Sequence, residues 1–92
     1  MIRSFADKET RELWFTGQSR RFGNILRVAI RKLQAIDFAV RVEDLNIPSG
    51  NRLEKLRGDR EGQYSIRIND QYRVCFRWEA KDAFDVEITD YH

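Results

Sequence analysis

Cysteine, proline, methionine and histidine each occur only once in this chain of 92 residues, and these scarcities exclude several classes of structure. The single cysteine, Cys75, cannot form an internal disulfide or a cysteine-rich zinc site, which fits a reducing compartment. One histidine and one cysteine leave no metal site of the usual type, so we expect neither a metal nor another cofactor. No long apolar run follows Met1, so we expect no signal peptide, no transmembrane helix, no membrane partner and a cytoplasmic location.

The composition indicates a small folded domain with an excess of arginine. A chain of this length is expected to form one domain, residues 1–92, and 41% hydrophobic residues supply its core. Lysine and arginine together number 17 against 15 acidic residues, and most of the basic residues are arginine. Arginine presents a rigid fork that suits phosphate and stacks on bases, although solvent-facing ion pairs explain the excess equally well from composition alone.

The first half of the chain has a helical pattern. Residues 2–5 predict a short strand, and residues 7–16 predict a helix with Asp7 at its N-cap and Gly17 at its end. Residues 19–39 predict a longer helix, because apolar residues recur there at steps of three and four. The short link between the helices favours an antiparallel pair. The apolar residues of the longer helix are Phe22, Ile25, Leu26, Ala29, Leu33 and Ile36.

The second half has a strand pattern, after a loop-like connector that holds the only proline. We expect a short strand at 52–57, a turn at 58–62, and longer strands at 63–69, 72–78 and 84–91. Their alternation gives one apolar and one polar face, typical of an antiparallel meander. The sequence therefore predicts a two-layer α+β fold, with the helix pair packed on the apolar face of the sheet. The residues expected on that face are Tyr64, Ile66, Ile68, Tyr72, Val74, Phe76, Trp78, Phe84, Val86 and Ile88.

The polar face of the predicted sheet gathers arginine, and such a surface can bind an anionic polymer. A structural role fits the same pattern, for example a cross-strand ion pair between Arg77 and Glu87. Arg73 differs, because a charge between two apolar neighbours in mid-strand needs a specific partner. The residues expected on or beside this face are Arg57, Arg60, Arg67, Arg73, Arg77 and Tyr91.

Residues 52–78, RLEKLRGDREGQYSIRINDQYRVCFRW, together with the terminal EITDYH, resemble HigB-type toxins of the RelE/ParE superfamily of bacterial toxin–antitoxin systems. Members share L-x-x-L-x-G-x-R-x-G-x-x-S-I, then an aromatic-Arg-aliphatic-x-Phe segment, then a closing Asp-Tyr-His. Asp90, Tyr91 and His92 fill the last motif, which separates this branch from ParE-like gyrase poisons. The expected helix pair agrees with the family layout, so the resemblance covers essentially the whole chain.

The resemblance implies a RelE-like fold and a ribosome-dependent mRNA endonuclease that acts in the ribosomal A site, beside 30S ribosomal RNA. It also implies inhibition by a helix-turn-helix antitoxin, HigA-like, and contact with operator DNA only through that antitoxin. Two alternatives stay open at this stage. One is a ParE-like inhibitor of DNA gyrase, and the other is a small RNA-binding protein without catalysis.

The resemblance also implies a set of site residues. This chain departs from some HigB toxins at two of them: those toxins have histidine where this chain has Glu54, and lysine where it has Arg57. We expect Arg73 to stabilise the transition state, Arg57 to be a second cationic clamp, and His92 to transfer a proton. Asp90 would orient that imidazole, Tyr91 would stack on a base or donate a proton, and Glu54 is a possible base. The residues expected to contact RNA or the ribosome are Arg60, Arg67, Arg77, Arg20, Arg21, Arg27, Arg31 and Lys32.

Overall fold

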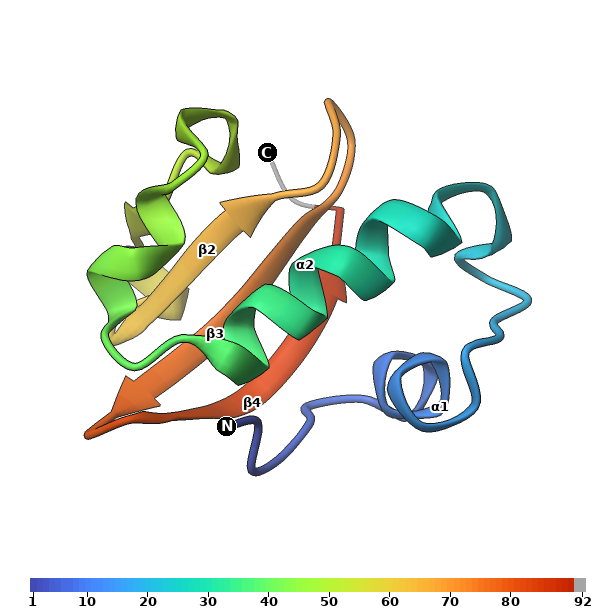
Figure 1. The fold of residues 1–92 in the computed structure, drawn as a ribbon, viewed down its shortest axis with the longest axis horizontal. Helices are drawn as coiled ribbons and strands as arrows, with labels where there is room; N and C mark the ends of the chain where they lie inside the picture. Colours follow the sequence, from blue (N-terminus) through green and yellow to red (C-terminus); the bar gives the residue numbers. More distant parts are fainter. Residues whose placement is uncertain (91–92) are drawn as a thin grey trace.

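The computed structural model describes residues 1–90 and contains two helices on one face of a four-stranded antiparallel sheet (Figure 1). The strands follow one another across the sheet in the order β1-β2-β3-β4, so the predicted meander and two-layer α+β architecture are confirmed. The elements are α1 (Lys8–Thr16), α2 (Leu26–Phe38), β1 (Glu54–Lys55), β2 (Gln63–Arg67), β3 (Arg73–Glu79) and β4 (Asp82–Thr89).

The core lies between α2 and the apolar face of the sheet. Helical spacing places Ala29, Leu33 and Ile36 on one side of α2, and none of these three has exposed surface. In Figure 1, α2 runs across the sheet while α1 is seen nearly end-on beside β4. A hydrogen bond from the Ile88 amide to Thr10 Oγ1, 3.0 Å long, ties α1 to β4. The sheet residues in this core are Ile66, Ile68, Val74, Phe76, Ala83, Val86 and Ile88.

The second helix begins later than the sequence predicts. Gly17 ends α1 with φ of 72°, a left-handed conformation that glycine adopts at little cost. The chain then forms a turn, in which the Phe22 amide donates to Ser19 Oγ at 3.0 Å, and a 3₁₀ turn at Gly23–Ile25 before α2 starts at Leu26. Phe22 and Ile25 are nevertheless buried, so the predicted apolar face is kept without α-helical geometry at its start.

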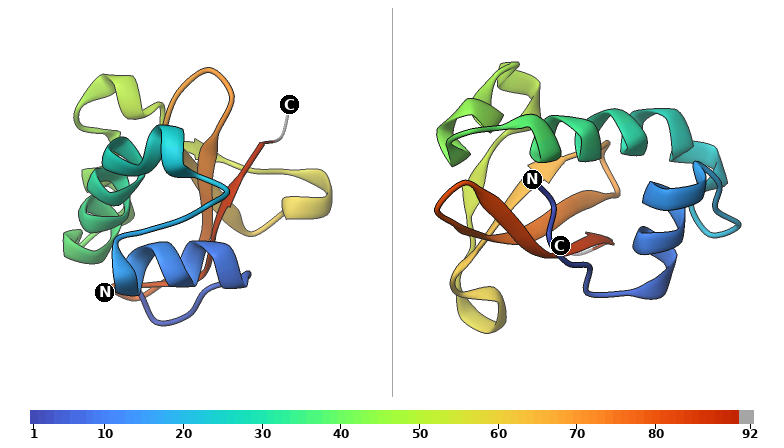
Figure 2. Two further views of the ribbon diagram at one scale, coloured as in Figure 1. Left: turned by 90° about the vertical axis from the view of Figure 1, so that its right-hand side faces the viewer. Right: turned by 60° about the horizontal axis from the view of Figure 1, so that its bottom comes forward.

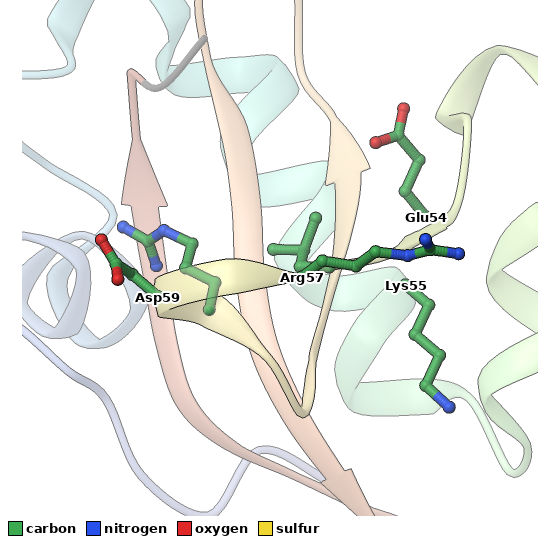
Figure 3. Close-up of a pocket in the computed structure, with 6 residues that line it drawn as sticks. Glu54, Lys55, Arg57 and Asp59 are labelled. Atoms are coloured by element: carbon green, nitrogen blue, oxygen red, sulfur yellow. The ribbon is translucent and has the colours of Figure 1, made fainter.

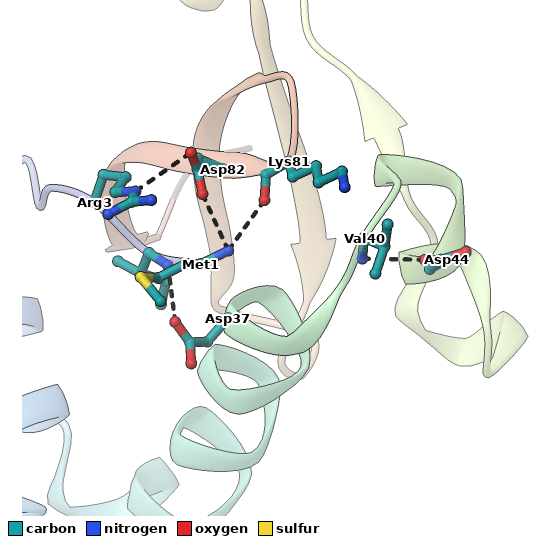
Figure 4. A network of polar contacts seen from close by, with 8 residues as sticks. Met1, Arg3, Asp37, Val40, Asp44, Lys81 and Asp82 are labelled. Carbon is teal, nitrogen blue, oxygen red and sulfur yellow. Dashed lines mark hydrogen bonds and ion pairs between the residues drawn. The ribbon is translucent and has the colours of Figure 1, made fainter.

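The first residues of the chain run beside β4 and cover its outer edge. Ile2 and Phe5 form parallel bridges with Ala83 and Val86, so the predicted strand at 2–5 is present as isolated bridges. Figure 4 shows how this segment is held between the sheet and α2: the Ile2 amide donates to Asp37 Oδ1 at 2.8 Å. A covered edge cannot pair with another chain, which protects this side of the sheet from edge-to-edge association.

A β-bulge in β4 corrects two predictions from the strand pattern. Cys75 pairs with Glu87, but Arg77 pairs with Phe84, so β4 has one extra residue near Asp85, whose φ is 53°. Phe84 therefore lies on the polar face beside Arg77, and its predicted place on the apolar face is wrong. The predicted ion pair between Arg77 and Glu87 is also wrong, because the bulge moves these residues out of register; Arg77 Nε instead lies 2.8 Å from Asp85 Oδ2.

The connector between α2 and β1 is more ordered than a loop. It contains the 3₁₀ turns Val42–Asn46 and Ser49–Asn51. Asn51 is buried, and its Oδ1 accepts a hydrogen bond from Lys32 Nζ while its Nδ2 donates to the Leu45 carbonyl at 3.1 Å. The connector is therefore fastened to α2. In the part of the chain that the structure describes, neither helix has the length and apolar character needed to cross a bilayer.

We predict that Leu33→Ala lowers the free energy of unfolding by about 2–5 kcal/mol, because the truncated side chain leaves a cavity between α2 and the sheet. Urea denaturation measures this change. Gln34→Ala is the matched control, since Gln34 is the exposed neighbour of Leu33 on the same helix. Equal destabilisation by the two substitutions would contradict the assignment of Leu33 to the core.

Candidate functional site

Arg73 is held in place on the face of the sheet away from the helices, as the alternation with buried Val74 predicts. Its side chain is only 15% exposed. Nε donates to Ser65 Oγ at 2.8 Å, and Nη2 donates to the Arg52 carbonyl oxygen at 2.7 Å and lies 3.7 Å from Glu54 Oε1. Hydrogen bonds to a charged group contribute roughly 1.5–3 kcal/mol each, so the guanidinium is fixed before any ligand arrives.

Two open hollows meet at Glu54, which lines both. The first has a volume of about 410 Å³ and is lined by Glu54, Lys55, Leu56, Arg57, Asp59 and Arg60. The second has a volume of about 310 Å³ and is lined by Arg52, Glu54, Arg67, Asn69, Asp70, Gln71 and Arg73. The structure thus brings the predicted residues Arg57, Arg73 and Glu54 into one continuous region at the β1 edge of the sheet.

The first hollow contains an arginine, Arg57, that has no polar partner among the described residues. Figure 3 shows the Arg57 side chain reaching back along β1 toward Glu54 and Lys55, and away from Asp59. Within residues 1–90, the Arg57 guanidinium makes no hydrogen bond or ion pair. Arg57 follows β1, the strand that carries Glu54. Because the Arg57 side chain is exposed, an incoming anion can reach it.

The other predicted arginines of the polar face have carboxylate partners. Arg60 Nη1 lies 3.1 Å from Glu87 Oε1, which ties the turn at Gly58–Arg60 to β4. In Figure 2 (left view) this turn projects from the side of the sheet opposite the helices. Arg67 pairs with Asp70, and Arg77 pairs with Asp85 and Glu79. Their pairing supports a structural role for Arg60 and Arg77 beside the predicted contact with RNA.

Asp90 is hydrogen-bonded to a residue that lines the second hollow. Its Oδ2 accepts a hydrogen bond from Gln71 Nε2 at 3.1 Å, and Gln71 lines that hollow. The end of β4 is therefore directed toward the region that contains Arg73. Tyr91 and His92 lie outside the described residues, so their expected roles remain predictions.

The basic residues predicted on the helix layer differ in their position relative to this site. Exposed Arg20 and Arg21 line a hollow of about 520 Å³ between the start of α1 and the turn after it. Arg27 and Arg31 are exposed on α2, whereas the Lys32 ammonium is hydrogen-bonded to Asn51. Burial, together with the charges of Arg31 and Arg67, lowers the pKa of Lys32. Lys32 is thus near Asn51 and Arg67 at one side of the second hollow, whereas Arg20 and Arg21 line a separate hollow.

Sequence reasoning missed two contributors to the site. Ser65 pairs with Cys75 in the ladder and is thus diagonal to Arg73, a placement that follows from the strand register once the turn at 69–70 is recognised. Arg52 was missed as well. Its φ of 48° turns its carbonyl toward Arg73, and this conformation has no signal in the sequence beyond the loop-forming residues before it.

Cys75 lies beside Arg73 on the polar face but has no exposed surface. Burial raises the pKa of its thiol to about 11, and the nearby positive charge of Arg60 only partly opposes that shift. A thiol with this pKa is protonated at neutral pH, so Cys75 is not a nucleophile there. Among residues 1–90, no group of carboxylate, histidine and cysteine side chains is arranged to hold a metal ion.

The arrangement suits the binding of a phosphodiester. It offers one fixed guanidinium, further cations around it, and a carboxylate within reach of both hollows. Fixed donors directed at developing negative charge are often the largest contribution to catalysis by such sites. A carboxylate beside them supplies a group that can accept a proton.

Comparisons with known proteins identify the family of this chain and a solved structure with the same fold. A family model described as RelE-like toxin of type II toxin-antitoxin system HigB matches residues 3–92. Toxin HigB-1 of Vibrio cholerae serotype O1 is 39% identical over 80 residues, which span 85% of this chain and 84% of that protein. Endoribonuclease HigB of Proteus vulgaris is 39% identical over 61 residues, 66% of this chain and 65% of that protein.

A solved structure shares the fold. The YoeB-YefM complex from Staphylococcus aureus contains a chain that superposes with a TM-score of 0.58 at 16% sequence identity, covering 100% of this chain and 98% of that chain. At this level of identity the likeness supports the architecture of two helices on an antiparallel sheet and nothing finer.

We predict that the free energy of unfolding falls as the pH rises from about 9 to about 11, and that Cys75→Ala removes part of this dependence. Across this window the unfolded thiol, with its ordinary pKa of 9.0, loses its proton, whereas the folded thiol keeps it up to about 11. Deprotonation therefore favours the unfolded state as the pH rises. Urea denaturation of both proteins across this range tests the effect, and parallel pH profiles would contradict the burial of Cys75.

Proposed function

Because this chain belongs to the family of HigB-like, RelE-like toxins of type II toxin–antitoxin systems, we propose that it is a ribosome-dependent endoribonuclease that cleaves mRNA in the A site. The observation that carries the proposal is the Arg73 guanidinium, fixed by Ser65, Arg52 and Glu54 on the open face of the sheet. A relative from Proteus vulgaris that carries the name endoribonuclease HigB supports the same activity.

The reaction uses a nucleophile that RNA itself carries. The ribose 2′-hydroxyl attacks the adjacent phosphorus, a new oxygen–phosphorus bond forms, and the bond to the leaving 5′-oxygen breaks. Arg73 stabilises the negative charge that develops on the phosphoryl oxygens, and Arg57 is a second cation for the same chain of phosphates. Holding the reacting groups in line contributes several kcal/mol in reactions of this kind.

Proton transfers complete the reaction. A base removes the 2′-hydroxyl proton, and an acid protonates the leaving 5′-oxygen. Glu54 Oε1 lies 3.7 Å from Arg73 Nη2, so its carboxylate is beside the phosphate that Arg73 would hold, and we assign it as the base on this position. His92 is the acid, since imidazole titrates near neutral pH. Asp90 orients His92, and Tyr91 stacks on a base of the RNA.

The partners follow from the family. The inhibitor is a HigA-like helix-turn-helix antitoxin, and the complex contacts operator DNA through the antitoxin. Arg20, Arg21, Arg27 and Arg31 are exposed on the helix layer and line neither of the two hollows at the proposed cleavage site. Their position supports contact with 30S ribosomal RNA, because phosphate contacts by arginine orient a protein on RNA without reading its sequence. The reaction takes place in the cytoplasm, where the translating ribosomes are.

We predict that Arg73→Ala lowers the rate of mRNA cleavage by about 10²–10³-fold, because the transition state loses its fixed cation. The measurement maps 5′ ends on an mRNA during in vitro translation, with and without ribosomes. Removal of His92 should have a similar effect, and both variants should still bind the antitoxin and show wild-type circular dichroism.

Arg3→Ala is the control, because Arg3 pairs with Asp82 at a distant corner of the molecule. The Arg3→Ala variant should cleave mRNA at the wild-type rate. Full cleavage by the Arg73 or His92 variant would overturn the assignment. A DNA damage response without cut transcripts would replace the proposal with gyrase inhibition, and RNA binding without cleavage would replace it with a binding role.

We predict that Glu54→Gln lowers the cleavage rate by about 10²-fold or more, because the amide accepts no proton. Single-turnover cleavage on stalled ribosomes measures this effect. Glu54→His, which places an imidazole there as in some HigB toxins, should retain activity. A rate for Glu54→Gln equal to that of the wild type would show that Glu54 only balances the charge of Arg73.

A further inference from the structure

We infer that Arg52 binds a backbone phosphate of the RNA next to the cleaved junction, and that the RNA strand follows the edge strand β1 from Arg52 to Arg57. This inference rests on the proposed function and adds a binding residue that neither the sequence pattern nor the family resemblance identifies. Three observations support it: the charge around the second hollow, the backbone conformation of Arg52, and the absence of a partner for its guanidinium.

The second hollow concentrates positive charge. Arg67 and Arg73 are directly opposite each other in the pairing of β2 with β3, and Arg52 lines the same hollow. Like charges in directly opposed positions destabilise a sheet. The compensating carboxylates are weakly placed, because the Asp70 side chain is 100% exposed and that of Glu54 is 55% exposed. A bound anion would relieve this repulsion, as a phosphate of the substrate does.

The backbone of Arg52 has a conformation that favours glycine. Its φ of 48° lies in the left-handed region, which costs roughly 1–2 kcal/mol for a residue with a Cβ. The turn itself has a clear use, since it directs the Arg52 carbonyl to Arg73 at 2.7 Å. Glycine would present the same carbonyl without strain. The hydrogen bond from Arg73 therefore does not account for an arginine at this position, and residues held in such conformations cluster at functional sites.

The Arg52 side chain points into solvent in the part of the chain that the structure describes. It is exposed, and within residues 1–90 its guanidinium makes no hydrogen bond or ion pair. The same is true of Arg57 at the other end of β1. Two guanidiniums with no polar partner among the described residues thus line the two hollows that share Glu54, one in each hollow.

This arrangement fits a single-stranded phosphodiester chain. The planar guanidinium fork forms paired hydrogen bonds with phosphate oxygens. Arg52 and Arg57 would hold phosphates on opposite sides of the junction that Arg73 and Glu54 act on. These contacts are to phosphates and not to bases, so the contact from Arg52 should be independent of RNA sequence.

The test separates the side chain of Arg52 from its backbone. Arg52→Gly keeps the carbonyl, relieves the backbone strain and removes the guanidinium. Arg52→Gln removes the charge without adding the backbone flexibility of glycine. Arg52→Lys keeps the positive charge. Arg41→Ala, an exposed arginine beside the end of α2, is the matched control. Binding to a single-stranded 2′-O-methyl RNA oligonucleotide, which cannot be cleaved, is measured by fluorescence anisotropy at several salt concentrations. Melting temperatures and cleavage during in vitro translation are measured in parallel.

We expect Arg52→Gly and Arg52→Gln to bind the oligonucleotide about tenfold more weakly at low salt. The slope of log affinity against log salt concentration should decrease by about 0.7, the value for one phosphate contact on a single strand. Arg52→Lys and Arg41→Ala should keep the wild-type slope. Arg52→Gly should melt at or above the wild-type temperature, so its weaker binding is not a loss of fold.

Unchanged slopes and cleavage rates for both uncharged variants would overturn the inference, while cleavage by the wild type would leave the proposed function intact. Loss of binding by Arg52→Gly alone would also overturn it, because the backbone and not the charge would then matter. If the wild type cleaved no mRNA, the proposed function would fail, and the salt slopes would still decide whether Arg52 contacts RNA.

Discussion

The site depends on one guanidinium that the fold immobilises with three unlike oxygens. A serine hydroxyl from β2, a backbone carbonyl from the connector and a carboxylate from β1 all converge on Arg73. Because each oxygen comes from a different segment, the Arg73 guanidinium is held in this position only when β1, β2 and the connector are all folded. Arginine suits such a place, because its rigid planar fork loses less freedom per hydrogen bond than a lysine chain.

The two faces of the sheet have separate tasks. One face is closed by the helices and carries the core, so its residues are constrained by packing. The other face has no covering layer in the described part of the chain, and its residues are constrained by charge pairing. At the β4 side this pairing is complete, with Arg60 joined to Glu87 and Arg77 to Asp85. Toward β1 the described cations outnumber their carboxylate partners, so positive charge is concentrated at one end of the face.

Much of the architecture could be predicted, because regular alternation along β2 and β3 fixes which side chains face the helices. The position of Arg73 followed from that rule. Phe84 did not, because the segment FDVEIT alternates perfectly in sequence while Asp85 inserts a bulge that only the contacts with Arg77 explain. The left-handed conformation of Arg52 could not be predicted either, because its carbonyl accepts a hydrogen bond from Arg73, which is 21 positions away in the sequence. The family motif identified the terminal residues, of which the structure describes Asp90.

The parallel bridges between the first residues and β4 join segments about 80 positions apart in the chain. Ile2 and Phe5 can find their places only after residues 83–86 have been synthesised, so the fold closes late. A nascent chain leaves the ribosome in order, and until β4 emerges α1 also lacks its hydrogen bond from Ile88. The N-terminal segment and α1 therefore reach their final positions only after β4 has formed, although they come first in the sequence.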